Sequence, residues 1–305
     1  MAKIAVLLGG DSAEREVSLR SGEAVANALE EHGLQVLRID PAERSIAELI
    51  SENIERVIIM LHGRGGEDGA IQGALQTLGI AYSGSGVLGS ALAMDKIRSK
   101  RIFQSEGLPT APYYVATEAS LEAFDAQAVM SQLNNEIMVK PALEGSSIGM
   151  SRVKSAEELQ AAITKALQFD REVLVEQYVT GKEYTVSILA DKALPSIRME
   201  TPHSFYDYEA KYHTNTTQYH CPSGLTAEEE QHLADIAIRA FKAVGASGWG
   251  RVDVMRDQQG NFFILEVNTV PGMTEKSLVP MAAKQAGMSF TDLVLAIAKT
   301  CECRR

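Results

Sequence analysis

Residues 251–268 read RVDVMRDQQGNFFILEVN, and this stretch decides the fold of the second half of the chain. Two runs rich in β-branched and aromatic residues flank a polar turn with a glycine, which predicts a β-hairpin. If the hairpin loop spans residues 258–261, Asp253 lies opposite Glu266. Because side chains alternate between the two faces of a strand, one face then carries four polar residues: Arg251, Asp253, Glu266 and Asn268.

Two carboxylates and an amide oxygen on one face repel one another or stay unsatisfied without a cation. Oxygen donors of this kind select Mg²⁺ or Mn²⁺ over zinc. The alternative is an exposed polar face on an edge hairpin. A Pro271-Gly272 turn follows at once, which indicates a loop held close to a neighbouring group.

The composition limits the class of protein. The chain has 305 residues, of which 45% are hydrophobic and 23% charged, as expected of a globular protein with about two domains. A formal net charge of −11 without a basic patch excludes nucleic acid as a partner. An anion would therefore be bound by a few placed Lys and Arg residues, by backbone N–H groups or by a metal.

No membrane association or secretion is predicted. No apolar run approaches the roughly 18 residues of a membrane span, and the first residues show no signal-peptide pattern. Three cysteines cannot form a disulfide framework, so the sequence predicts a cytoplasmic protein. Cys301 and Cys303 could form a metal pair, but two ligands at a frayed terminus make a poor site.

The first third of the chain alternates apolar strands with helices. Strands are predicted over Lys3 to Leu8, Gln35 to Asp40, Arg56 to Leu61 and Ile80 to Ser83. Helices are predicted over Ser12 to Glu31, from a capping box at Ser45, and over Ala70 to Leu78. This alternation indicates a parallel sheet covered by helices. Ligands of such sheets bind beyond the carboxyl ends of the strands, here at Gly9-Gly10 and residues 62–69.

The remaining two thirds have an α+β pattern. One long helix is predicted over Gly86 to Glu106, and a domain boundary near residues 95–110. Strands are predicted at Tyr113 to Ala116, Glu136 to Lys140, Glu172 to Gln177 and Glu183 to Ala190. A helix is predicted over Ala227 to Val244 from its apolar spacing, and capping boxes are predicted at Ser155 and Thr226. The segment Thr201 to Pro222 holds four of the nine tyrosines and three of the six histidines, which indicates either a functional lid or a structural loop.

Two glycine motifs each have two interpretations. Residues 84–89 match G-x-G-x-x-G, which indicates either a dinucleotide site or, more simply, a turn into a helix.

Residues 145–149 match the G-x-S-x-G of a hydrolase elbow, but that elbow needs a strand before the serine and a helix after it. A Gly-Ser loop with Lys140 just before it suits a phosphate cradle better. Glu14 and His62 lie past strand ends, and each has a plain structural interpretation as well.

Taken in order, motifs along nearly the whole chain resemble the D-alanine–D-alanine ligase family of the ATP-grasp superfamily. They are Leu8-Gly9-Gly10 with residues 12–18, Leu61-His62-Gly63 with residues 65–69, Met94-Asp95-Lys96, Val139-Lys140-Pro141, residues 144–147, 176–179, 208–212, 251–253, 266–269 and 271–274, and Ser277. The resemblance implies an α/β N-terminal domain with a parallel sheet, followed by two α+β lobes that form an ATP-grasp fold. The implied divisions are 1–95, 96–180 and 181–305, with a lid loop over 201–222.

The resemblance also implies site residues. ATP would lie between the second and third divisions, bound by Lys96, Lys140, Ser147, Glu176, Tyr178, Val179, Glu183 and Lys211. Asp253, Glu266 and Asn268 would bind two Mg²⁺ (or Mn²⁺) ions. Glu14 and His62 would bind the first D-alanine and Ser277 the second, while Ser146 and Tyr212 would form a hydrogen-bonded set with Glu14. Arg251 and the N–H of Gly272 would stabilise the oxyanion.

The implied activity is the ATP-dependent ligation of two D-alanines through an acyl phosphate, for peptidoglycan synthesis. Tyr212 resembles the dipeptide-forming relatives and not those that make D-alanine–D-lactate. A homodimer is expected as well. Two alternatives stay open at this point: a serine hydrolase built on residues 145–149, and a non-catalytic small-molecule binder.

Overall fold

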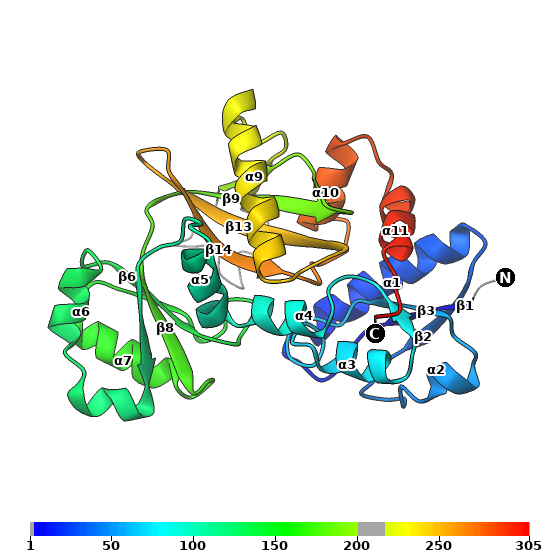
Figure 1. The fold of residues 1–305 in the computed structure, drawn as a ribbon, viewed down its shortest axis with the longest axis horizontal. Helices are drawn as coiled ribbons and strands as arrows, with labels where there is room; N and C mark the ends of the chain where they lie inside the picture. The colour runs from blue at the N-terminus through cyan, green and yellow to red at the C-terminus, as the bar shows by residue number, and fades with distance from the viewer. Residues whose placement is uncertain (1–2, 201–216, 305) are drawn as a thin grey trace.

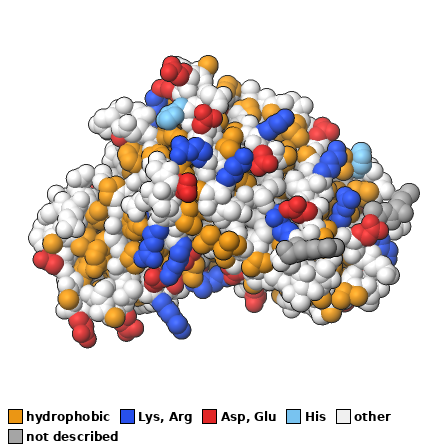
Figure 2. All heavy atoms as spheres, in the orientation of Figure 1, with side chains coloured by type: hydrophobic (Ala, Val, Ile, Leu, Met, Phe, Trp, Pro, Cys, Tyr) orange, Lys and Arg blue, Asp and Glu red, His pale blue; other side chains and the backbone are white. Residues whose placement is uncertain are grey.

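The computed structural model describes residues 3–200 and 217–304, and every structural statement below refers to this part of the chain. Its strands form three sheets, each with its own helices (Figure 1). No helix in the described ranges is long and apolar enough to cross a membrane. On the face drawn in Figure 2, Lys and Arg side chains are interspersed with Asp and Glu.

The first sheet is parallel, as predicted, in the order β2-β1-β3-β4. Its strands are β1 (Lys3–Leu7), β2 (Gln35–Ile39), β3 (Arg56–Ile59) and β4 (Ala81–Tyr82), and its helices are α1 (Arg15–Glu31), α2 (Glu48–Ser51) and α3 (Ala70–Thr77). The apolar runs of β1 and β3 are buried because helices cover the sheet. The capping box predicted at Ser45 is wrong, since α2 begins at Glu48 and has Ala47 at its N-cap without a side-chain bond.

The long helix predicted over residues 86–106 is two helices. α4 (Val87–Met94) ends at Asp95, and α5 (Lys96–Ser105) begins at the next residue. Asp95 has an extended backbone, and its carboxylate accepts hydrogen bonds from the N–H groups of Ile97 and Arg98, so it is the N-cap of α5. The apolar pattern continues across the break, so the break was not predicted. It places Lys96 in the first turn of α5.

The second sheet is antiparallel, in the order β5-β8-β6-β7. Its strands are β5 (Tyr113–Thr117), β6 (Ile137–Pro141), β7 (Ser151–Val153) and β8 (Glu172–Gln177). The 3-10 helix η1 (Glu118–Ala123) follows β5, and α6 (Ala126–Gln132) and α7 (Ala156–Ala166) pack apolar residues against the sheet. The hydroxyl of Ser155 caps α7 as predicted, by accepting from the N–H of Glu158 at 3.2 Å.

The third sheet has the path β12-β11-β9-β13-β14, with β10 beside β9. Its strands are β9 (Gly181–Leu189), β10 (Lys192–Ala193), β11 (Ile197–Glu200), β12 (Gln218–His220), β13 (Trp249–Asp257) and β14 (Phe262–Asn268). Helix α9 (Ala227–Ala243) begins in a complete capping box at Thr226 and covers this sheet (Figure 1). Its apolar face is formed by Leu233, Ile236, Ala237, Ala240 and Phe241.

The β13–β14 hairpin has the predicted pairing but a different turn. Asp253 lies opposite Glu266, and Arg251 opposite Asn268. Nearer the turn, Arg256 pairs with Phe262, one residue out of the register that the loop 258–261 requires. A bulge between the Asp253 and Val254 pairs absorbs the difference and restores the predicted face.

The last two helices return to the first sheet. α10 (Leu278–Gln285) and α11 (Phe290–Lys299) contribute Val279, Leu293 and Ile297 to the same buried cluster as β1 and β3. α11 lies beside α1 (Figure 1). Beyond α11, Glu302 forms a β-bridge with Tyr82. Arg304 then donates a 2.8 Å hydrogen bond to Oγ of Ser247, just before β13, so the chain end contacts both the first and the third unit.

Candidate active site

Two cavities meet at the junction of the three units. Cavity A, of about 410 Å³, is lined by residues of the first and third units that include Glu14, His62, Arg251, Gly272 and Ser277. Cavity B, of about 390 Å³, lies between the second and third sheets and is lined by residues that include Lys140, Ser147, Glu176, Tyr178, Val179, Glu183 and Asp253. The two cavities share Lys96, Gly145, Ser146 and Glu266. Groups bound in A and B therefore meet at this shared wall.

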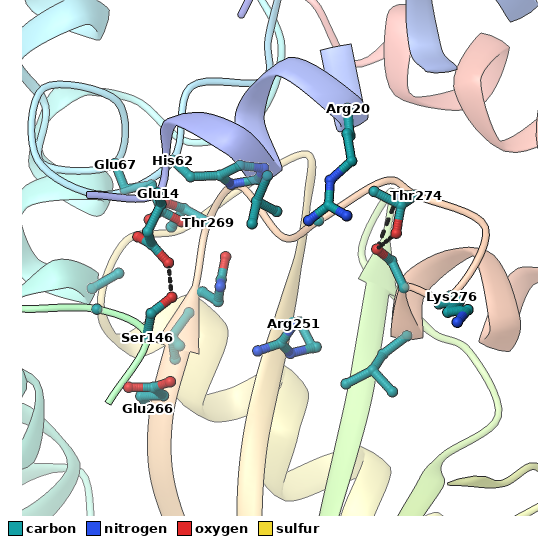
Figure 3. Close-up of a pocket in the computed structure, with 18 of the residues that line it drawn as sticks. Glu14, Arg20, His62, Glu67, Ser146, Arg251, Glu266, Thr269, Thr274 and Lys276 are labelled. Atoms are coloured by element: carbon teal, nitrogen blue, oxygen red, sulfur yellow. Dashed lines mark hydrogen bonds between the residues drawn. The ribbon is translucent and has the colours of Figure 1, made fainter. Parts of the chain in front are cut away.

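Glu14 is held at the inner end of cavity A. It lies at the N-cap of α1, where the helix dipole favours a carboxylate, and it is buried. Ser146 donates a hydrogen bond to Oε1 of Glu14 (Figure 3). A side chain at Gly63 or at Gly145 would place its Cβ 2.8 Å from Oε2 of Glu14. Glycine is therefore required on both sides of this carboxylate.

Two more titratable groups surround Glu14. His62 is buried, its Nε2 lies 3.4 Å from Oγ of Ser21, and burial lowers its pKa, so the imidazole is neutral. Burial and the charge of Glu14 raise the pKa of Glu67 to about 8, although Oε2 of Glu67 accepts a 2.7 Å hydrogen bond from the N–H of Gly63. At neutral pH Glu67 is thus mostly protonated and adds little charge beside Glu14.

The hairpin face carries the predicted oxygen donors. Asp253 accepts two hydrogen bonds from Arg251, at 2.8 and 2.7 Å, and one from Thr185 at 2.6 Å. The Nζ atom of Lys96 lies 3.7 Å from Oε2 of Glu266. Two cationic side chains thus face the two carboxylates.

The donor set fits a hard divalent cation. Asp253 and Glu266 are opposed in the hairpin, and both line cavity B. Asn268 lines cavity A and adds an amide oxygen, which here accepts from the N–H of Val270 at 3.1 Å. Only oxygen donors are present, which suits Mg²⁺ or Mn²⁺. The described residues contain no cluster of three or more His, Cys, Asp or Glu that could bind a metal, including at the two C-terminal cysteines.

The opposite end of cavity A is formed by the loop before α10. Ser277 is the N-cap of α10, and its Oγ accepts a 2.9 Å hydrogen bond from the N–H of Thr274. A Cβ at Gly272 would lie 3.0 Å from this Oγ, so the turn needs a glycine. The N-terminus of α10 therefore faces the cavity, and helix N-termini bind carboxylates and phosphates well.

Arg20 of α1 lies at the same end of cavity A. Its side chain points from α1 toward the loop that carries Thr274 (Figure 3). Ser21, the next residue, fixes α1 against this loop by accepting a 3.0 Å hydrogen bond from the N–H of Met273. Within the described ranges, the only hydrogen bond of the Arg20 side chain is from Nε to the carbonyl of Glu16, at 3.4 Å, and it has no acidic partner.

Cavity B contains a buried charge triad. Glu176 lies between Lys140 and Lys100, with Lys100 Nζ 2.9 Å from its Oε2. Burial alone would raise the pKa of Glu176, but the two lysines outweigh it and lower the pKa to about 2. Burial lowers the pKa of Lys100. The carboxylate of Glu176, a predicted adenine-binding residue, therefore holds Lys140 beside the cavity.

The loop at residues 145–149 does not form a hydrolase elbow. β6 ends at Pro141, and β7, not a helix, follows the loop. Ser146 and Ser147 both have positive φ, at 49° and 61°, which turns the backbone sharply at the shared wall. This geometry removes the structural basis of the serine-hydrolase hypothesis and suits a phosphate cradle.

The G-x-G-x-x-G at residues 84–89 has a packing role. Ser85 Oγ accepts a 3.1 Å hydrogen bond from the N–H of Ser247, and a Cβ at Gly89 would clash with the carbonyl of Gly245. The motif thus forms a turn into α4 that packs closely against the loop before β13. Residues 84–89 line neither cavity A nor cavity B. The C-terminal end of α4, which follows the motif, does line cavity A.

Some predicted site residues lie outside the described part of the chain, and some residues in or beside the two cavities were not predicted. Lys211, Tyr212 and most of the predicted lid lie outside the described residues, although Gln218–His220 form β12. The sequence analysis missed Arg20, Glu67 and Lys100. Glu67 stands in a glycine-rich loop after a strand, and Lys100 follows Lys96 by one helical turn, so both had a weak signal.

The parallel first sheet, the two antiparallel sheets and the paired cavities between them constitute the ATP-grasp fold, which defines the class of this protein. The family described as "D-ala D-ala ligase C-terminus" matches residues 102–299. A D-alanine–D-alanine ligase of Pseudoalteromonas atlantica is 59% identical over 298 residues, 98% of this chain and 94% of the relative. The chain belongs to the D-alanine–D-alanine ligase family.

Solved structures agree with this assignment. The D-alanine–D-alanine ligase of Bacillus anthracis complexed with ATP has a TM-score of 0.85 and 32% identity, and the match covers 98% of this chain and 97% of that one. The VanG D-Ala:D-Ser ligase of Enterococcus faecalis has a TM-score of 0.84 and 28% identity, covering 98% and 99%. Family membership also removes the hypothesis of a non-catalytic binder.

Proposed function

We propose that this chain joins two D-alanine molecules into D-alanyl-D-alanine, with conversion of ATP to ADP and phosphate. The observation that carries the proposal is the wall shared by cavities A and B. A carboxylate in cavity A and a nucleotide triphosphate in cavity B would meet at Lys96, Ser146 and Glu266. Such a meeting point is what transfer of a phosphoryl group to a carboxylate requires.

In the first step, an oxygen of the first D-alanine carboxylate attacks the γ-phosphorus, and the bond to the ADP oxygen breaks. Glu14 binds the ammonium group of this D-alanine, beside neutral His62. Lys96 and Lys140 neutralise negative charge on the phosphates during transfer. Asp253, Glu266 and Asn268 would hold two Mg²⁺ ions, which would supply further neutralisation of negative charge.

In the second step, the amine of the second D-alanine attacks the acyl carbon. The oxyanion that forms is stabilised by Arg251 and the N–H of Gly272. Collapse of the tetrahedral intermediate forms the peptide bond and releases phosphate, while the amine loses its proton. Ser277, the N-terminus of α10 and Arg20 bind the carboxylate of the second D-alanine at the positive end of cavity A.

The remaining assignments complete the proposal. Tyr212 joins the Ser146–Glu14 pair, Lys211 reaches the ATP, and residues 201–222 close over the site to keep water from the acyl phosphate. Glu176, Tyr178 and Val179 form the adenine hinge, Glu183 binds the ribose, and Ser147 the phosphates. We further propose the division at residues 1–95, 96–180 and 181–305, a homodimer, and a cytoplasmic role in peptidoglycan synthesis.

The proposal is tested by phosphate release from ATP in the presence of Mg²⁺, with dipeptide measured in parallel. Release is expected with D-alanine and not with L-alanine. D-serine and D-lactate as added acceptors would show whether the chain prefers the acceptor of its dipeptide-forming relatives. Absence of D-alanine-dependent release would refute the proposed function.

A further inference from the structure

An ion pair joins two loops that belong to different sheets. Arg64 lies in the loop after β3, and its Nε donates to Oε1 of Glu144, in the loop after β6, at 2.8 Å. The Nη2 atom of Arg64 also donates to the carbonyl of Phe169 at 3.4 Å and lies 3.8 Å from Oδ2 of Asp170. The first unit is thus attached to the second at this point.

The ion pair flanks the two glycines that enclose Glu14. Gly63 precedes Arg64, and Gly145 follows Glu144. A Cβ on either glycine would lie 2.8 Å from Oε2 of Glu14, so neither loop leaves room for a side chain beside this carboxylate unless Glu14 shifts. The pair Arg64–Glu144 therefore fixes the separation of the two loops between which Glu14 lies.

Glu144 is also tied to the shared wall of the cavities. Its carbonyl accepts a 2.5 Å hydrogen bond from Nζ of Lys96. Two residues further on, Ser146 donates to Glu14. On the other side, the N–H of Leu143 donates to Oδ2 of Asp170 at 2.7 Å. A shift of Glu144 would move groups on both sides of the reacting atoms.

We propose that Arg64 and Glu144 form a positioning clamp, which holds the Gly63 and Gly145 loops around Glu14 and so sets the geometry of the first D-alanine site. The inference rests on the proposed function. Neither side chain lines cavity A, whereas Glu144 lines cavity B and Arg64 lines neither. The side chain of Arg64 is 48% exposed, and ion pairs of this exposure add little to folding stability. The effect is therefore expected on catalysis, where misplacement of a positioning group by about 1 Å can cost roughly 10²-fold.

The test is a double-variant cycle with Arg64→Met, Glu144→Gln and the pair combined. Each single variant should raise the Michaelis constant of the first D-alanine site about tenfold, as resolved from the two-site dependence of rate on D-alanine. In Arg64→Met, which changes a residue outside cavity B, the constant for ATP should change much less. The combined variant should be no worse than the poorer single one. Arg64→Lys should restore part of the loss.

Arg38→Met is the matched control. Arg38 pairs with Glu30 and Glu23 wholly within the first unit, and its loss should leave both D-alanine constants unchanged.

An unchanged first-site constant in both single variants, or additive losses in the combined variant, would overturn the clamp. If the unsubstituted chain showed no D-alanine-dependent turnover, the proposed function would fail instead. Glutamine has nearly the size of glutamate, so Glu144→Gln still tests the clamp if Arg64→Met folds poorly.

Discussion

Ser146 donates a hydrogen bond to Glu14, from a residue 132 positions away in the sequence. The bond joins the loop after β6 to the start of α1, so it connects the second sheet to the first. It lies where cavities A and B meet, with Lys96 and Glu266 on the same wall. The position of the loop after β6 and the position of Glu14 are therefore coupled.

Glu14→Gln should impair the first D-alanine site. The substitution keeps the shape but removes the only charge that we assign to the substrate ammonium. Loss of one partner of a buried charge pair costs at least about 2 kcal/mol, so the first-site Michaelis constant should rise about 30-fold or more. Steady-state kinetics would measure this, and an equal rise in the constant for ATP would contradict the assignment.

Arg251→Ala should lower turnover far more than nucleotide affinity. Removal of one oxyanion donor costs roughly 10²–10³ in rate. ATP binding, measured directly by calorimetry or equilibrium dialysis, should stay within a few-fold of the unsubstituted chain. Equal losses of turnover and ATP affinity would show that Arg251 acts mainly by holding Asp253, with which it pairs in the structure.

Asp253→Asn should raise the Mg²⁺ concentration needed for half-maximal rate. The amide keeps an oxygen donor but loses the charge that a hard cation prefers. Gln258→Glu, at the exposed turn of the same hairpin, is a control that adds charge outside both cavities and should leave the requirement unchanged. A Mg²⁺ titration that does not move in Asp253→Asn would refute the metal assignment.

Arg20→Met should weaken binding of the second D-alanine. Arg20 points toward the loop of Thr274 and has no acidic partner in the described part of the chain. Its loss should raise the second-site Michaelis constant by about 3- to 10-fold, since a partly exposed charge contributes roughly 1 kcal/mol. Arg101→Met on α5, which lines neither cavity, is the matched control. Loss at the first site alone would contradict this role.

Glu67 should make folding stability depend on pH. Its pKa is about 8 in the folded chain and near 4.5 when unfolded, so between these values the folded state holds a proton that the unfolded state lacks. Unfolding then releases a proton, and stability falls as pH rises from about 4.5 to about 8, by up to about 1.4 kcal/mol per pH unit.

Glu67→Gln should remove this slope. Denaturant unfolding of both proteins at pH 5.5, 6.5 and 7.5 would measure it. The variant should gain stability relative to the parent as the pH rises. Parallel pH profiles for the two proteins would show that Glu67 does not keep its proton when folded.

Much of the fold could be predicted because local patterns and tertiary packing agree. The apolar runs of β1 and β3 predict their buried parallel pairing. The Asp253–Glu266 pair was predicted from an assumed loop at residues 258–261, and it occurs because the bulge offsets a different turn. The break at Asp95 could not be predicted, because a carboxylate that caps α5 interrupts a helix whose apolar pattern continues across it. The bulge beside Asp253 likewise depends on pairing with β9 on the other side of β13.

Less of the site than of the fold could be predicted from the sequence. Residues with an assigned chemistry could be named one by one, but their neighbours could not. Lys100 and Glu67 matter because other chain segments bury them beside Glu176 and Glu14, and burial of this kind is set by tertiary structure. The pairing of Arg64 with Glu144, 80 residues apart, is equally invisible in the sequence.

The central claim is that cavity A supplies a carboxylate to the phosphoryl group in cavity B. It is tested most directly with D-alanine labelled by ¹⁸O in both carboxylate oxygens. One ¹⁸O should appear in the released phosphate for each dipeptide formed, because the bridging oxygen of the acyl phosphate leaves with the phosphate when the amine attacks. Unlabelled phosphate alongside dipeptide would contradict the account.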